Sequence, residues 1–135
     1  MEGPSPARLY ASLAGAVLTI AGIVGFFYSA SLGSPGNVDD ALGAFAVNGW
    51  INLLHIATGA LGLWMASFAA RRYALYAGAL YTAIAVWGFV VGGGGTILSL
   101  IPLSVGDNFL HLALGALGLA AAFGTPARVG TAPAT

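Results

Sequence analysis

The sequence predicts an all-α membrane protein with four transmembrane helices built from two parallel two-helix repeats. The 135-residue chain is 59% hydrophobic and only 6% charged, whereas soluble domains carry about 25% charged residues. Four apolar stretches are each close to the 20 residues or so that cross a hydrocarbon core of about 30 Å. A helical motif also occurs twice, 56 residues apart. A water-soluble fold could not cover its surface with so few charges, so we expect one membrane domain over residues 1–135.

The repeated motif reads N-x-x-H-x-x-x-G-x-x-G and contains the only two histidines of the chain. Its members are Asn52, His55, Gly59 and Gly62 in the first copy, and Asn108, His111, Gly115 and Gly118 in the second. At 3.6 residues per turn these four positions fall within an arc of roughly 80°. Each copy therefore predicts a helix with one small and polar stripe.

The first apolar stretch, residues 9–28, has no charge and predicts a first span after a flexible polar tail at residues 1–8. A cleaved signal peptide is the alternative, with a weak cleavage match at residues 29–31. Signal peptides have apolar regions of about 7 to 15 residues, and this one is longer. We therefore expect a retained span.

A loop over residues 31–48 then leads to the second span. Its turn residues and two aspartates keep it in water, and Leu42–Val47 is expected to lie at the membrane interface. Asn48 is a suitable cap for a helix that starts near Gly49 and spans the membrane from about Trp50 to Ala70. The Arg71-Arg72 pair is expected to stop this helix.

The third span is expected from about Tyr73 to Gly92, where four consecutive glycines end it because of their backbone entropy. Residues 96–103 are apolar but broken by Pro102, and we expect them along the interface. Ser104 is a candidate cap for the fourth span, which reaches about Gly124. A flexible tail is expected over residues 125–135.

The first and third spans match at an offset of 63 residues, as the second and fourth do at 56. Repeat one covers about residues 8–70 and repeat two about 71–124. Two spans per copy give both copies the same orientation, so a pseudo-two-fold axis should run along the membrane normal. Small residues on these helices should mediate close packing: Gly15, Thr19, Gly59, Gly62, Gly78, Thr82, Gly115 and Gly118.

All eight charges are expected outside the four spans, and their signs separate. The arginines fall on one side, and three aspartates on the other: Arg8, Arg71, Arg72 and Arg128 against Asp39, Asp40 and Asp107. Cytoplasmic loops carry the excess of arginine and lysine. Both termini are therefore predicted to be cytoplasmic.

The paired motif helices, the Arg-Arg turn and the four spans resemble the bacterial domain-of-unknown-function family 4383, over about residues 8–124. One departure is Asp107, which stands where the first copy has Ile51. The resemblance implies a small four-helix integral membrane protein of the bacterial inner membrane and implies no reaction.

Several classes of function are disfavoured by composition. A formal net charge of zero and the lack of a basic patch argue against nucleic acid. Without cysteine there is no thiolate site, and two histidines are too few for a closed zinc site. No nucleophile is paired with a base, and no carboxylate lies inside a span, so we expect neither an enzyme nor a proton-coupled transporter.

The histidines leave two interpretations open. In the first, Asn52, His55, Asn108 and His111 form a structural polar stripe whose imidazoles hydrogen-bond inside the bundle. In the second, one or both of His55 and His111 bind a haem or chlorophyll, because helical bundles place axial histidines on facing helices. We favour the first, with no cofactor.

The expected function is non-enzymatic: a structural or accessory subunit, in contact with lipid and with a membrane-protein partner or a second copy. A minimal channel or transporter is a less favoured third class.

Overall fold

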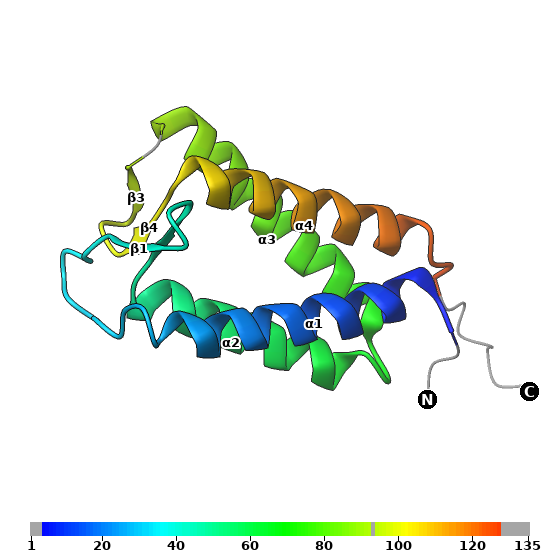
Figure 1. The fold of residues 1–135 in the computed structure, drawn as a ribbon. Helices are drawn as coiled ribbons and strands as arrows, with labels where there is room; N and C mark the ends of the chain where they lie inside the picture. The colour runs from blue at the N-terminus through cyan, green and yellow to red at the C-terminus, as the bar shows by residue number, and fades with distance from the viewer. Residues whose placement is uncertain (1–3, 93, 128–135) are drawn as a thin grey trace, which may run out of the picture.

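The computed structural model describes residues 4–92 and 94–127 and is mostly helical (Figure 1). Its four helices are α1 (Pro6–Gly25), α2 (Gly49–Met65), α3 (Ala70–Val91) and α4 (Val105–Phe123). Arg128, Gly93 and most of the two expected tails lie outside the described residues. Residues 6–8, expected in the first tail, already belong to α1, because Ser5 caps that helix by accepting a hydrogen bond from the Arg8 N–H.

Three of these helices, α1, α3 and α4, are long and apolar enough to cross a membrane. Helix α2 has 17 residues and is shorter than predicted. The chain turns at residues 66–68, and α3 begins at Ala70. The prediction that the Arg71-Arg72 pair forms the turn is therefore wrong. Arg71 lies in the first turn of α3. Its Nε donates to the carbonyls of Ala122 and Thr125 at the end of α4.

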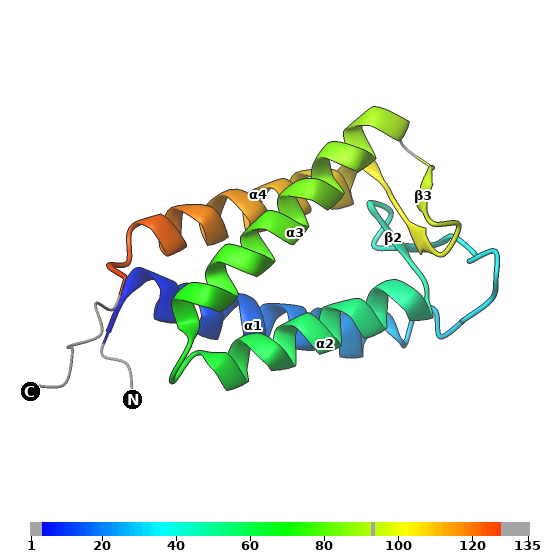
Figure 2. The same ribbon diagram turned by 180° about the vertical axis from the view of Figure 1, so that it is seen from behind.

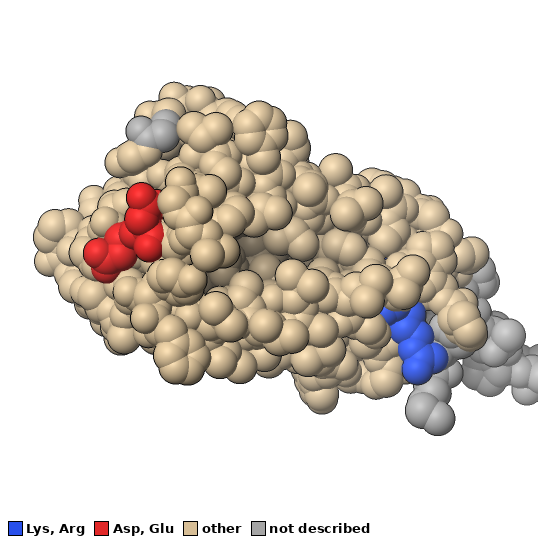
Figure 3. Space-filling view, viewed as in Figure 1, with Lys and Arg blue, Asp and Glu red and all other residues tan. Residues whose placement is uncertain are grey.

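All charges were expected outside the four spans, which stays a prediction. Four charged residues nevertheless lie in helices, each within the first turn: Arg8, Arg71, Arg72 and Asp107. These first turns lie at the two ends of the molecule. The positive and negative side chains of the described residues are therefore still on opposite ends, as predicted. Figure 3 shows acidic side chains at the end with the β-strands and basic side chains at the opposite end.

The helices run alternately along one axis (Figures 1 and 2). Helices α1 and α3 run towards the end with the β-strands, and α2 and α4 run back. Helix α1 packs mainly on α2, and α3 mainly on α4; we call these the first and second helix pairs. The pairs meet through α1 with α3 and α4, and through α2 with α3.

The segments expected at the membrane interface, residues 42–47 and 96–103, form parts of two antiparallel β-hairpins, which were not predicted. Their location at the interface stays a prediction. The first β-hairpin pairs β1 (Asp39–Ala41) with β2 (Phe45–Val47), and the second pairs β3 (Thr96–Ile97) with β4 (Ile101–Pro102). Each turn contains two successive residues with positive φ: Leu42 and Gly43 in the first, Leu98 and Ser99 in the second. This backbone conformation reverses the chain. The N–H and C=O groups of the apolar residues on either side can then bond across the β-hairpin.

The β-hairpins tie the two helix pairs together. Asn48 caps α2 as predicted, and its Nδ2 also donates to the carbonyl of Leu100 beside the second β-hairpin. Asp107 completes a capping box with Ser104 at the start of α4 and accepts a hydrogen bond of 2.9 Å from the Ala46 N–H of β2. Each β-hairpin therefore binds at the start of a helix in the other pair.

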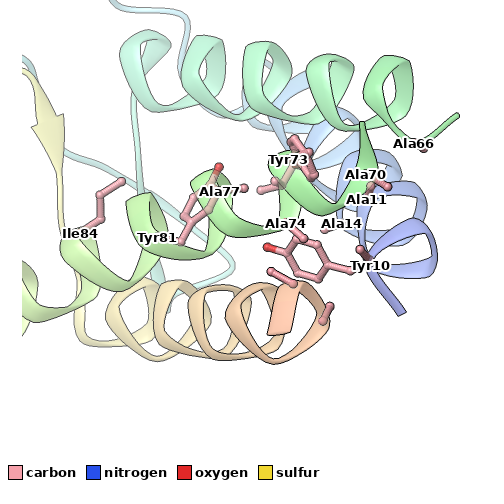
Figure 4. Packing of buried hydrophobic residues seen from close by; sticks show 14 of the residues in the cluster. Tyr10, Ala11, Ala14, Ala66, Ala70, Tyr73, Ala74, Ala77, Tyr81 and Ile84 are labelled. Carbon is pink, nitrogen blue, oxygen red and sulfur yellow. The ribbon is translucent and has the colours of Figure 1, made fainter. Parts of the chain in front are cut away.

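The core between the pairs combines tyrosines with alanines (Figure 4). Tyr10 of α1 and Tyr73 of α3 lie with ring centroids 6.1 Å apart, and Tyr81 is fully buried. The Tyr10 hydroxyl donates to the Leu114 carbonyl at 2.9 Å. Alanines leave room for these rings, so bulky polar-tipped side chains fill the interior while many large aliphatic side chains face outwards.

Candidate functional site

The predicted packing glycines lie where helix backbones meet. A Cβ on Gly15 would lie 2.9 Å from the Gly59 carbonyl oxygen of α2, and one on Gly78 would lie 2.7 Å from the Leu119 backbone nitrogen of α4. Real Cβ atoms essentially never come closer than 3.0 Å. Thr19 and Thr82 lie at the same contacts and donate back to the carbonyls four residues earlier, at 2.8 Å each. Side chains larger than glycine would force either pair apart.

The second glycine of each motif faces the other helix pair. A Cβ on Gly62 would lie 2.7 Å from the Tyr73 hydroxyl, and one on Gly118 would lie 2.8 Å from the Tyr10 hydroxyl. These glycines therefore provide space for a tyrosine from the opposite pair. Among the described residues the Tyr73 hydroxyl has no hydrogen-bond partner, unlike that of Tyr10.

The two motif asparagines are buried, each 1% exposed. Asn52 lies against Gly25 of α1, and Asn108 against Gly88 of α3. Asn52 donates to the Ser29 carbonyl at 2.8 Å. Asn52 thus supplies a donor to a carbonyl beyond the end of α1, where such groups need partners.

His55 of α2 and His111 of α4 meet across the boundary between the helix pairs. Their ring centroids lie 6.0 Å apart, with ring planes inclined by 66°. Nε2 of His55 and Nδ1 of His111 are buried, and neither has a hydrogen-bond partner in the described part of the chain. The structural interpretation expected each imidazole to be hydrogen-bonded within the bundle. These two nitrogens lack that bond.

Tyr81 is the third ring of this site and was not predicted. Its centroid lies 5.4 Å from that of His111 and 6.4 Å from that of His55. Its hydroxyl lies 2.7 Å from Oγ1 of Thr58, which also donates to the Leu54 carbonyl. One signal was available in the sequence, because the repeat offsets place leucines, Leu18 and Leu114, where these two polar residues stand.

The three rings limit what the site can hold. A macrocycle ligated by both imidazoles would lie in the plane midway between them. Tyr81 is almost equally distant from the two rings and occupies that plane. The residues present therefore do not fit a haem or chlorophyll bound by both histidines. Among the described residues there is also no group of three or more histidine, cysteine or acidic side chains spaced to hold a metal ion.

The fold is compatible with a membrane protein. Its helices are apolar, the charges of the described residues lie at the ends, and polar side chains lie in the interior. The chain belongs to a family described as domain of unknown function (DUF4383), whose model matches residues 8–124. This confirms the family resemblance drawn from the sequence. No curated protein and no solved structure matches the chain.

Proposed function

We propose that the chain is an integral membrane protein of four spans that serves, without catalytic activity, as a structural or accessory subunit of a larger membrane complex. The observation that carries this proposal is the distribution of exposed large hydrophobic side chains over all four helices. Examples are Leu13 and Val17 of α1, Leu61 and Trp64 of α2, Val86 and Val90 of α3, and Leu117 and Phe123 of α4. Hydrocarbon covers such surfaces at no cost in free energy, whereas water does not.

Helix α2 is proposed to be the remaining span. Its 17 residues measure about 25 Å, slightly less than the apolar thickness of about 30 Å. Helices α1 and α3 nevertheless begin at the same end of the molecule (Figure 1). If both cross the membrane, the segment that joins them must cross back. A bilayer can thin locally around a short helix at a modest cost.

The two helix pairs are proposed to be parallel repeats. Support comes from matching contacts at the repeat offsets: the glycine approaches, the threonine bonds and the positive-φ turns. We further propose that the arginine-bearing end faces the cytoplasm. We also propose the bacterial inner membrane as its location, on the basis of the family resemblance drawn from the sequence.

A non-enzymatic role is supported by the environment of the histidines. Within residues 4–92 and 94–127, neither unpartnered imidazole nitrogen bonds a serine, threonine or tyrosine hydroxyl. Nucleophilic catalysis needs a base within hydrogen-bond reach of the nucleophile. The threonine hydroxyls instead donate to carbonyls of their own helices.

Purification from native membranes tests the accessory role. The tagged chain, expressed at its natural level and extracted in mild detergent, should elute with a second membrane polypeptide, or a second copy, at fixed stoichiometry. Crosslinking in intact membranes before extraction should capture the same species, and harsh detergent should release the single 13.5 kDa chain. A lone chain in both the mild extract and the crosslinked membranes would contradict the proposal.

A further inference from the structure

We infer that His55 and His111 form a binding site for a single copper(I) ion, held between one nitrogen of each imidazole. This inference goes beyond the proposed function and does not depend on it. It starts from the two buried nitrogens without partners, His55 Nε2 and His111 Nδ1. A neutral imidazole has one nitrogen with a free lone pair, which either accepts a hydrogen bond or binds a metal.

The ring separation suits a shared metal ion. Metal–imidazole nitrogen bonds are about 2.0–2.1 Å long, so two rings that share one ion have centroids about 6 Å apart. The observed separation is 6.0 Å. A direct N–H···N bond of about 3 Å would bring the centroids to about 5 Å. The centroid separation is therefore longer than a direct N–H···N bond between facing nitrogens gives and is compatible with one atom that bridges them.

The surroundings select the charge and the coordination number of the ion. Zinc sites take four ligands, and the described residues supply no third histidine, cysteine or acidic ligand here. Tyr81 is not available as a ligand, because its hydroxyl is engaged by Thr58 at 2.7 Å. Copper(I) is a closed-shell ion that accepts two nitrogen donors in a near-linear arrangement, and imidazole is a common copper ligand.

Charge also favours a monovalent ion. The penalty for taking an ion out of water rises with the square of its charge, so a divalent ion in this interior would be disfavoured far more. Asp107 lies four residues before His111 on α4, which places its carboxylate one helical turn away on the same face. The single negative charge of the Asp107 carboxylate would complement the single positive charge of a copper(I) ion between the two imidazoles.

The experiment titrates the purified full-length chain in detergent with copper(I), under anaerobic reducing conditions, against a chromophoric copper(I) chelator. The expected result is one ion bound per chain. His55→Gln and His111→Gln should each weaken the affinity at least tenfold. Tyr76→Phe is the matched control: it changes an exposed aromatic side chain of α3 and leaves both ligands and the Tyr81–Thr58 bond in place, so its affinity should stay within about threefold of the wild type.

A second measurement keeps the test decisive if a histidine variant fails to fold, as judged by circular dichroism. X-ray absorption on the copper-loaded native chain should show two nitrogen ligands and no sulfur. Failure to hold copper(I) against the chelator would overturn the inference. So would sulfur ligation, unchanged affinity in folded histidine variants, or zinc(II) bound as tightly as copper(I). None of these outcomes would alter the result of the crosslinking experiment.

Discussion

At the scale of single residues, the absence of a side chain sets how closely the helices approach. Gly15 and Gly78 each lie where a partner helix presents backbone atoms rather than a movable side chain. A contact against backbone cannot be relieved by a rotamer change. In a membrane this close approach is a principal source of packing energy, because burial from lipid gives little hydrophobic gain.

Replacing Gly15 or Gly78 by leucine should separate the helices of the corresponding pair and destabilise the fold by about 1–3 kcal/mol or more. Thermal unfolding in detergent, followed by circular dichroism, measures the effect. Ala21→Leu and Ala83→Leu are matched controls on the same helices at exposed positions and should leave the midpoint nearly unchanged. Wild-type midpoints in both glycine variants would show that these contacts do not hold the pairs together.

Tyr81 and Thr58 should be energetically coupled. Tyr81→Phe removes one side of a buried hydrogen bond between side chains, which is typically worth about 0.5–1.5 kcal/mol. Tyr76→Phe, on an exposed side chain of the same helix, should have no measurable effect. In a double-mutant cycle with Thr58→Val, the two losses should not add, since either change alone breaks the bond. Simple additivity would argue against the bond.

Only part of the site could be predicted from these residues. The period of the motif places each histidine on the small and polar face of its own helix. It does not give the distance between the two helices. Tyr81 stands in an apolar run whose local pattern predicts only helix. Its role depends on Thr58, which lies in another helix pair. Contacts of that kind follow from tertiary packing, which no local sequence pattern specifies.

At the scale of elements, the β-hairpins contribute hydrogen bonds to the starts of helices to which they are not directly joined. Asp107 is the clearest case, because its carboxylate accepts from the N–H groups of both Ser104 and Ala46. The residue is thus a cap for α4 and a link to β2. This also explains the departure at this position, where the other motif copy has Ile51.

Asp107→Ala should destabilise the protein by about 1–3 kcal/mol, because the buried Ala46 N–H loses its acceptor. The exposed Asp40 of β1 offers a matched control, and Asp40→Ala should have little effect. Amide hydrogen exchange gives the more specific readout: protection should fall at Ala46 and at the start of α4. Equal exchange in the two variants would mean that the carboxylate is not the link.

The helices were easier to predict than their connections. Long apolar runs and the caps at Asn48 and Ser104 indicate where helices begin, and the structure keeps both caps. The end of α2 was predicted too late, because alanines near residues 66–70 favour a helix as readily as a turn. The β-hairpins were missed because each has only two or three residue pairs and turns through residues such as Leu42 and Leu98, which rarely adopt positive φ.

At the scale of the whole molecule, the acidic and basic side chains of the described residues occupy opposite ends (Figure 3). Most of the exposed aliphatic side chains lie on the helices between these ends, and a few, such as Leu42 and Leu98, lie on the β-hairpins. This asymmetry gives the molecule a direction, because arginine-bearing segments are retained on the cytoplasmic side of a membrane. The described charges therefore predict one orientation over its reverse.

Cysteine labelling in intact cells should reveal that orientation, since the chain has no native cysteine. Val38→Cys, exposed beside the first β-hairpin, should react with an impermeant thiol reagent. Ala127→Cys, exposed after α4 at the opposite end, should react only after the membrane is permeabilised. Labelling of the second position alone would reverse the orientation. Labelling of both would mean that only an even number of the three helices between them, α2, α3 and α4, crosses the membrane.

The hydrogen bonds between each β-hairpin and the other helix pair also bear on how the chain is made. Ala46 and Asn48 find their partners at Asp107 and Leu100, residues that leave the ribosome more than 50 positions later. In the proposed four-span topology, the first helix pair therefore enters the bilayer with these groups still bound to water at its surface. Its finished form is reached only when α4 begins to emerge, so that the last quarter of translation completes both halves together.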